Sequence, residues 1–313
     1  MKDDSAISAV VGGIVLLAIL SASLIYVNAF HVPRQGEAIE VAAREDAERA
    51  MASLAALLPQ GAPTVQDLPL RAPAQTPPLL SGLVLSPARA AGSAAFDPAG
   101  PTIGVSVVLA APAGGVPADD PVREALPGGL MRLHLVGNET AELPVGSLRL
   151  ATGSAYLDPA TYRAEGGALL LRRGGSSEAL LAPPLLVGAD GAGGARRTTV
   201  SLALPVLGGG AAEIAGAGSS QVALAARGDA QATGGLARNL TIAVTTDALA
   251  AWTAALTEAV GVSGTVTATS TGPDAGRVVA VILPPAGAPP NAPRVAYDIT
   301  MISYGVSMLG GAG

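Results

Sequence analysis

The sequence predicts an α+β protein. It should have a long N-terminal hydrophobic helix of transmembrane length with a kinked amphipathic extension, then a mainly antiparallel β-sandwich-like head containing one short helix. Three observations predict this order. A charge-free apolar run comes first, a stripe of helical period follows it, and the remainder alternates apolar and polar residues between turns rich in Gly and Pro.

The composition excludes several classes of protein. Half of the 313 residues are hydrophobic and only 13% are charged, which excludes an acidic disordered chain. A formal net charge of −6 disfavours binding to nucleic acid, and the absence of Cys excludes disulfides and thiolate chemistry. No phosphate-binding loop, zinc-protease motif or nucleophile elbow occurs. We therefore expect no enzyme, no catalytic residue, no cofactor and no metal site.

The N-terminal run is the clearest feature of the sequence. From Ser5 to Phe30, 26 consecutive residues carry no charge. A helix crosses a bilayer with about 20 apolar residues, whereas a cleaved secretory signal has a shorter core behind a basic segment. Here the preceding residues are Met-Lys-Asp-Asp. The sequence predicts a short leader at 1–5 and a transmembrane helix at 6–31 that contacts membrane lipid.

The orientation in the membrane rests on weaker signals. Lys2 stands before the run, and Arg34 and Arg44 stand after it, which alone would keep the C-terminal part in the cytoplasm. Two N-glycosylation sequons begin at Asn138 and Asn239 and favour an exported domain. Together with the Cys-free composition, they predict a single-pass protein of the cell membrane with its C-terminal domain outside.

A second helix is expected at 34–58, after a kink or break at Pro33. Its narrow, Ala-rich stripe suits packing on the protein's own head and packing on a partner helix equally well. Glu40–Arg44 and Glu45–Arg49 have the spacing of ion pairs on the opposite face. The apolar residues of the stripe are Ile39, Ala43, Ala47, Ala50, Met51, Leu54 and Leu58. The Pro-rich residues 59–78 are predicted to form a linker.

Residues 79–313 are predicted to form the β-rich head, as one unit or as two subdomains divided near 208–220. A hairpin is expected around Gly174 and Gly175, and a helix capped by Asp247 and Gly261 should place Trp252 against a sheet. Alternation predicts strands at 103–109, 131–135, 200–204, 240–245, 278–283 and 297–306.

The N-terminal segment resembles that of archaeal type IV pilin-like proteins. Asp-Asp-Ser followed by Ala6-Ile7-Ser8-Ala9-Val10-Val11-Gly12-Gly13 is similar to the family pattern Ala-Val-Ser-Pro-Val-Ile-Gly before a hydrophobic helix. Looser similarities to pilin-like β heads lie at Tyr162–Leu169, Gly174–Ser177, Pro183-Pro184, Ala250–Trp252 and Leu283–Pro285. Ala9 replaces the usual proline, and no basic residue followed by Gly or Ala precedes the run. We place the candidate processing site at Ser5 and Ala6.

The resemblance implies a pilin-like subunit or minor pilin of a surface filament, assembling with itself or with other pilin-like proteins through the N-terminal helix. Small residues allow close helix packing. The expected membrane and assembly residues are Ala6, Ile7, Ser8, Val10, Val11, Gly12, Gly13, Ala18 and Ala22. Two alternatives stay open: a single-pass anchored protein whose head binds a ligand or an envelope partner without polymerising, and a surface hydrolase.

Overall fold

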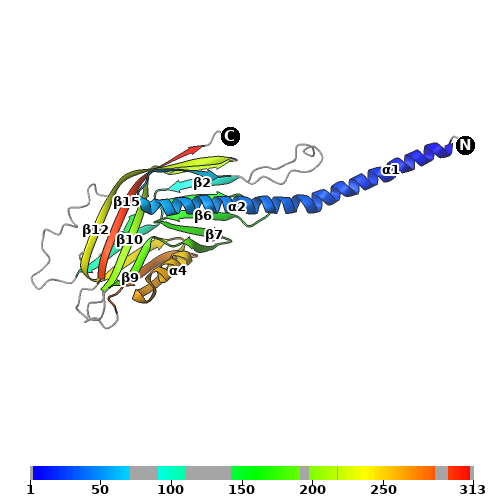
Figure 1. The fold of residues 1–313 in the computed structure, drawn as a ribbon. Coiled ribbons are helices and arrows are strands. Elements are labelled where there is room, and N and C mark those ends of the chain that lie inside the picture. The colour runs from blue at the N-terminus through cyan, green and yellow to red at the C-terminus, as the bar shows by residue number, and fades with distance from the viewer. Residues whose placement is uncertain are drawn as a thin grey trace, which may run out of the picture.

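The computed structural model describes residues 3–70, 91–109, 142–190, 197–216, 218–285 and 295–310. In this part of the chain, the predicted α+β class is confirmed: a long N-terminal apolar helix, a second short helix and mostly antiparallel sheets, with no closed barrel among the described residues. Figure 1 shows the strands gathered around the second half of a long helical rod, whose first half projects away from the head. The predicted strand at 131–135 lies outside the described residues.

The rod consists of α1 (Asp3–Tyr26), the π-helical turn η1 (Val27–His31) and α2 (Val32–Leu57). Pro33 was expected to kink or break the helix. It does not break the helix, which continues from η1 into α2 through this residue. Proline has no amide hydrogen, and its ring excludes the carbonyl four residues earlier. The π turn absorbs this misfit, since the Val32 amide donates to the Val27 carbonyl, five residues back.

Residues directly after α2 belong to the head, so the predicted linker at 59–78 needs correction. The short 3-10 turn η2 (Leu58–Gln60) leads into β1 (Thr64–Pro69), which pairs antiparallel with β12. Leu68 and Leu70 are buried. Pro69 is tolerated at the end of this strand because the adjacent Leu70 amide binds the Gly218 carbonyl, so the Pro69 nitrogen faces away from β12, where no described strand needs a donor. Residues 71–78 lie outside the described part.

The first sheet is built around β12 (Ser219–Thr246), the longest strand, which pairs with β14 and β15 along one edge and with β1 and β3 along the other. The pairing of β10 with β15 is parallel. The other strands of this sheet are β3 (Thr102–Leu109), β4 (Glu142–Pro144), β9 (Leu185–Asp190), β10 (Arg197–Gly208), β13 (Gly264–Gly272), β14 (Ala275–Ile282) and β15 (Val295–Gly310).

The second sheet is antiparallel in the order β11-β2-β5-β6-β7-β8. Its strands are β2 (Gly92–Asp97), β5 (Ser147–Thr152), β6 (Ala160–Glu165), β7 (Ala168–Arg173), β8 (Ser176–Leu181) and β11 (Ala212–Gly216). The predicted hairpin is β7–β8. Its turn residues Gly174 and Gly175 have φ of 54° and 90°, the left-handed conformation that a two-residue hairpin turn requires. Near the expected subdomain division at 208–220, β11 belongs to this second sheet, although β10 before it and β12 after it in the sequence belong to the first.

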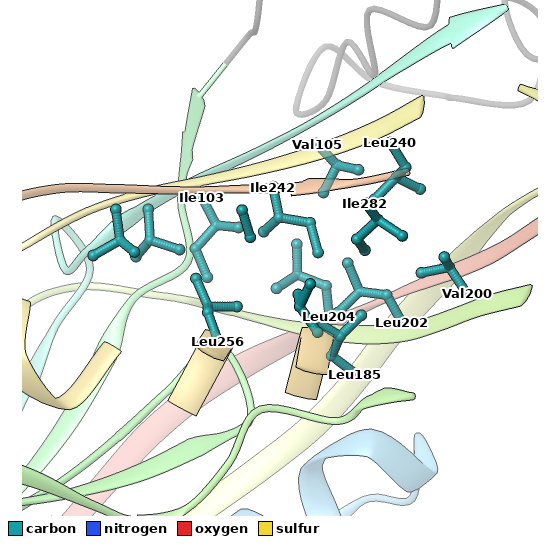
Figure 2. Close-up of a cluster of buried hydrophobic side chains, with 14 of the residues drawn as sticks. Ile103, Val105, Leu185, Val200, Leu202, Leu204, Leu240, Ile242, Leu256 and Ile282 are labelled. Carbon is teal, nitrogen blue, oxygen red and sulfur yellow. The ribbon is translucent and has the colours of Figure 1, made fainter. Parts of the chain in front are cut away.

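Two hydrophobic cores hold the head together, and the second sheet lies between them. Along β7, Ala168 and Leu170 enter the first core, whereas Leu169 and Leu171 enter the second. The first core joins the larger sheet to α4 (Leu249–Val260), and Figure 2 shows Leu256 of this helix facing Ile103 and Ile242 of the sheet. The second core packs α2 against both sheets.

Candidate functional site

The apolar surface of α1 is the largest candidate functional surface. Every large apolar side chain from Val10 to Tyr26 is at least 40% exposed, and they point to all sides of the helix. A helix that is apolar all round is stable only when lipid or other helices surround it. The segment is long and apolar enough to cross a membrane. The 29 residues from Asp3 to His31 span roughly 43 Å at 1.5 Å per residue, more than the hydrocarbon core of a bilayer.

The expected assembly residues lie within α1. Gly12, Gly13, Ala18 and Ala22 are exposed, and a Cβ added at Gly12 or Gly13 would meet no atom within 4 Å. The backbone of Ser5, Ala6, Ile7 and Ser8 is helical, but their side chains lie outside the described part. The candidate processing site therefore falls in the first two turns of the helix. Val10 and Val11 are 62% and 54% exposed.

The two sequons differ in what the structure describes. Asn138 lies outside the described residues. Asn239 sits on β12, opposite Val108 of β3, and is partly buried. Its Oδ1 is enclosed and accepts no hydrogen bond from the described residues. A glycan on this side chain would have to leave from within a paired strand.

Where α1 passes into α2, the rod becomes attached to the head. The buried face of α2 is formed by Val32, Gly36, Glu40, Ala47, Met51, Leu54 and Ala55. Sequence reasoning left open whether this stripe packs on the protein's own head or on a partner helix. The structure assigns it to the head, because Ala47, Met51, Leu54 and Leu58 are fully buried in the second core.

The strongest polar contact between rod and head is made by Glu40, which is only 8% exposed. Its carboxylate accepts hydrogen bonds from the Ser154 hydroxyl at 2.6 Å and from the amides of Ala155 at 2.6 Å and Leu157 at 3.0 Å. The Tyr156 amide donates to the same carboxylate at 3.1 Å. We call Glu40 and the loop 154–157 the Glu40 latch. Charge-assisted bonds of this kind are about twice as strong as neutral ones.

Contacts on either side of the latch extend it along α2. One turn before Glu40, the ring of Tyr156 packs directly on Gly36, where an added Cβ would lie 2.3 Å from a ring carbon. One turn after it, Arg44 donates to the carbonyl of Asp158, and the Tyr162 hydroxyl donates to the carbonyl of Arg44 at 3.3 Å. The expected Glu40–Arg44 pair is therefore wrong, because both side chains bind the head. Arg49 pairs with Asp46 at 2.7 Å and not with Glu45.

The latch also sets the charge of Glu40. Burial alone would raise the pKa of this carboxyl, because it removes water from the charged form. The hydrogen bonds from Ser154 and the three backbone amides favour the carboxylate and outweigh burial, so the pKa of Glu40 lies below its ordinary value. Glu40 is therefore ionised at neutral pH.

A second polar cluster is buried between the smaller sheet and α4. Arg163 of β6 is 5% exposed and pairs with Glu165 at 2.7 Å, and Glu165 also accepts a hydrogen bond from the Trp252 indole at 2.8 Å. Arg163 also pairs with Asp247, which follows β12. Burial raises the pKa of Glu165 against the opposing effects of Arg163 and Trp252. The cluster ties α4 to β6, so Trp252 covers the sheet as expected.

Asp247 does not cap α4, contrary to the sequence-based expectation. Burial would raise the pKa of Asp247, but the bond and charge of Arg163 lower it, so this carboxylate is held by the ion pair. The first turn of α4 is capped from elsewhere: Asp274 accepts from the Leu249 amide through its carbonyl and from the Ala250 amide through its side chain. Gly261 ends the helix with φ of 53°, as predicted.

Among the described residues, no arrangement of side chains points to catalysis or metal binding. Within them, no group of three or more His, Cys, Asp or Glu side chains is placed to hold a metal ion. Both buried carboxylates, Glu40 and Glu165, are already occupied by donors from the protein itself. The chain matches no protein-family model, no curated protein and no solved structure.

Proposed function

We propose that this protein is a structural cell-surface protein, a pilin-like subunit or minor pilin whose α1 is inserted in the membrane or in a filament core. One observation carries the proposal: a helix that is apolar on all sides continues without interruption into a helix that is buried in the head. Membrane-inserted α1 would place η1 at the lipid boundary, where the rings of Tyr26 and Phe30 suit the interface.

The attachment of α2 supports a mechanical role. A subunit that assembles through one end and presents a head at the other must transmit force between them. The Glu40 latch and the second core fix α2 to both sheets along most of its length. Helical backbone therefore connects α1 to the head, with no loop between them.

The similarity of the N-terminal segment to archaeal type IV pilin-like proteins adds the second support, and the small residues of α1 the third. Gly12, Gly13, Ala18 and Ala22 leave room for a neighbouring helix to approach closely. The same α1 in a single-pass protein that stays monomeric would serve only as an anchor. Filament assembly and processing near Ser5 therefore distinguish the two functions.

The test uses the full chain in its native envelope. Material sheared from cells is viewed by electron microscopy, and the N-terminus is determined by intact-mass and peptide analysis. We expect filaments that contain this protein, with a mature N-terminus at Ser5 or Ala6. A protein found only in membranes, monomeric and with an intact Met1 or Lys2 terminus, would overturn the filament proposal in favour of the simple anchor.

A matched pair of variants tests the helix contact itself. Ala18→Phe adds bulk to the small-residue surface, whereas Leu17→Phe replaces a side chain that is already large and 66% exposed. We expect Ala18→Phe to abolish filaments while the protein stays in the membrane with a folded head, and Leu17→Phe to retain them. Equal assembly of both variants would contradict a role for this surface.

A further inference from the structure

The strand β13 ends the larger sheet and is the feature that the proposed function leaves unexplained. It pairs with β14 along one edge, and among the described strands no partner lies along the other. Residues 265 and 267–271 are exposed. A row of unpaired backbone amides and carbonyls on an edge strand can pair with another chain.

The other terminal strands carry a charge that opposes such pairing, but β13 does not. Among the described strands, six have a single partner: β13, β9, β1 and β4 in the larger sheet, and β11 and β8 in the smaller one. The other five each carry an acidic residue: Asp190 on β9, Asp67 on β1, Glu142 on β4, Glu213 on β11 and Glu178 on β8. The sequence of β13 is Gly-Thr-Val-Thr-Ala-Thr-Ser-Thr-Gly, with no charge and no proline. Two copies of this edge could therefore meet without bringing like charges together.

The sequence of β13 also reads nearly the same in both directions. Ala268 is its centre, and Thr267 and Thr269, Thr265 and Thr271, and Gly264 and Gly272 are equidistant from it. Two antiparallel copies centred on Ala268 would therefore place Thr opposite Thr along one face. Cross-strand Thr pairs are favourable, and a two-fold dimer requires a surface that is complementary to itself.

The backbone of β13 is oriented for this register. The Leu283 amide donates to the Ser263 carbonyl at 2.9 Å, so residue 263 forms a hydrogen-bonded pair with residue 283. Successive strand residues point their amides and carbonyls to alternate edges. The odd-numbered residues thus bind β14, and Ala268 with the other even-numbered residues presents its amide and carbonyl to the free edge.

We propose that β13 is a homodimerisation edge: two copies of the chain pair through antiparallel β13 strands, with the two-fold axis at Ala268. The contact joins heads side by side and does not involve α1, so it goes beyond the filament proposal and does not rest on it. Nine strand residues span about 30 Å, which makes a small interface. Anchoring both copies in one membrane strengthens it by raising their effective concentration.

The test uses single cysteines, since the chain has none of its own. Ala268→Cys in the full chain is oxidised under mild conditions in native membranes. In the proposed register the two Cα atoms would lie about 5.5 Å apart, a separation that a disulfide can span. We expect a disulfide-linked dimer that forms roughly tenfold faster, or more, than with Leu186→Cys on β9. Leu186 is 74% exposed on a terminal strand that carries Asp190. Equal rates for the two variants would mean random collision and overturn the proposal.

A register test makes the result specific. Thr267→Cys and Thr269→Cys should cross-link with each other when differently tagged chains share a membrane. Each alone should cross-link poorly, because identical residues would then lie diagonally, about 7–8 Å apart. The side chains are exposed, so the fold is checked simply by the fluorescence of the buried Trp252. Efficient self-linking of Thr267→Cys without the mixed product would contradict the Ala268 axis.

Discussion

The two halves of the helical rod, α1 and α2, differ in what surrounds their apolar residues. In α1, no large apolar side chain from Val10 to Tyr26 is buried. In α2, Met51 and Leu54 are fully buried against both sheets, and Glu40 is bound by a loop of the head. The backbone runs from one half to the other through a single π turn.

This difference indicates that the two halves of one continuous helix depend on different surroundings. Tertiary packing, more than helix propensity, stabilises most helices in proteins. The head supplies that packing for α2, whereas α1 needs lipid or neighbouring helices. Substitutions in α1 should therefore change membrane insertion and assembly, and substitutions on the buried face of α2 should change the stability of the head.

Leu54→Ala should have the largest effect, because it leaves a cavity in the second core. We expect a loss of about 2–5 kcal/mol in the free energy of unfolding of the head. The measurement is denaturant unfolding of the full chain in detergent micelles, followed by circular dichroism and Trp252 fluorescence. Leu16→Ala is the matched control: Leu16 is 60% exposed on α1, and its truncation should leave the head unchanged. A comparable loss in both variants would contradict the separation of the two halves.

Leu17→Arg should impair insertion of α1 and leave the head folded. A charged side chain at the centre of a membrane helix costs about 2.5–3.5 kcal/mol on insertion scales. We expect the protein to shift from the membrane fraction to the soluble or aggregated fraction after alkaline extraction. Thr253→Arg, an equal charge on the partly exposed face of α4, should remain in the membrane.

The fold was predictable where the signal is local. The charge-free run before Phe30 predicts α1, and Gly174-Gly175 between two alternating segments predicts the β7–β8 hairpin. The strand β1 was missed because Pro63 and Pro69 are also typical of linkers, and only the pairing with β12, 150 or more residues later, makes the segment a strand.

Glu40→Ala should weaken the attachment of α2 to the head. The substitution removes a charged acceptor and leaves the amides of the loop 154–157 without this partner. We therefore expect the free energy of unfolding to fall by about 1.5–3 kcal/mol. Hydrogen exchange of the amides at Ala155 and Leu157 should become faster as well. Glu37→Ala, at an exposed position one turn earlier, should change neither quantity. Unchanged exchange in Glu40→Ala would show that the latch does not hold the loop.

Gly36→Ala should lower the free energy of unfolding by about 1–3 kcal/mol, because the new methyl group displaces the ring of Tyr156. Gly12→Ala is the matched control on α1, where an added Cβ meets no atom within 4 Å. There the substitution should leave the head unchanged and favour the helix slightly, since Ala has the higher helix propensity. The same unfolding measurement distinguishes the two, and equal stabilities would contradict close packing of α2 at Gly36.

Acid should lower the stability that the Glu40 latch contributes, by less than the substitutions above. The pKa of Glu40 is lower in the folded protein than in the unfolded chain, so its contribution is present above the ordinary carboxyl pKa. That contribution is lost as the pH falls through the lowered pKa, because the protonated group accepts hydrogen bonds less strongly. The free energy of unfolding is measured for the wild type and for Glu40→Gln between about pH 7 and pH 3. It should fall more steeply with decreasing pH in the wild type. Parallel curves would rule out a role for this ionisation.

The candidate site was less predictable than the fold, because its partners are distant in sequence. Glu40 looks like any charge on a solvated helix face, and its partners are backbone amides more than 110 residues later, which have no sequence signature. Asp247 has the position of a helix cap, but Arg163, 84 residues earlier, binds it instead. Only α1 has features local in the sequence, a long charge-free apolar run, that indicate a candidate functional surface without the structure.

We expect α1 to lie in an apolar environment that the protein does not supply, and α2 to lie outside the membrane with the head. Labelling of single cysteines in intact cells with a membrane-impermeant maleimide tests it most directly. Leu17→Cys should remain unlabelled, and Glu45→Cys, on the exposed face of α2, should be labelled. Labelling of Leu17→Cys, or labelling of Glu45→Cys only after the cells are permeabilised, would contradict the claim.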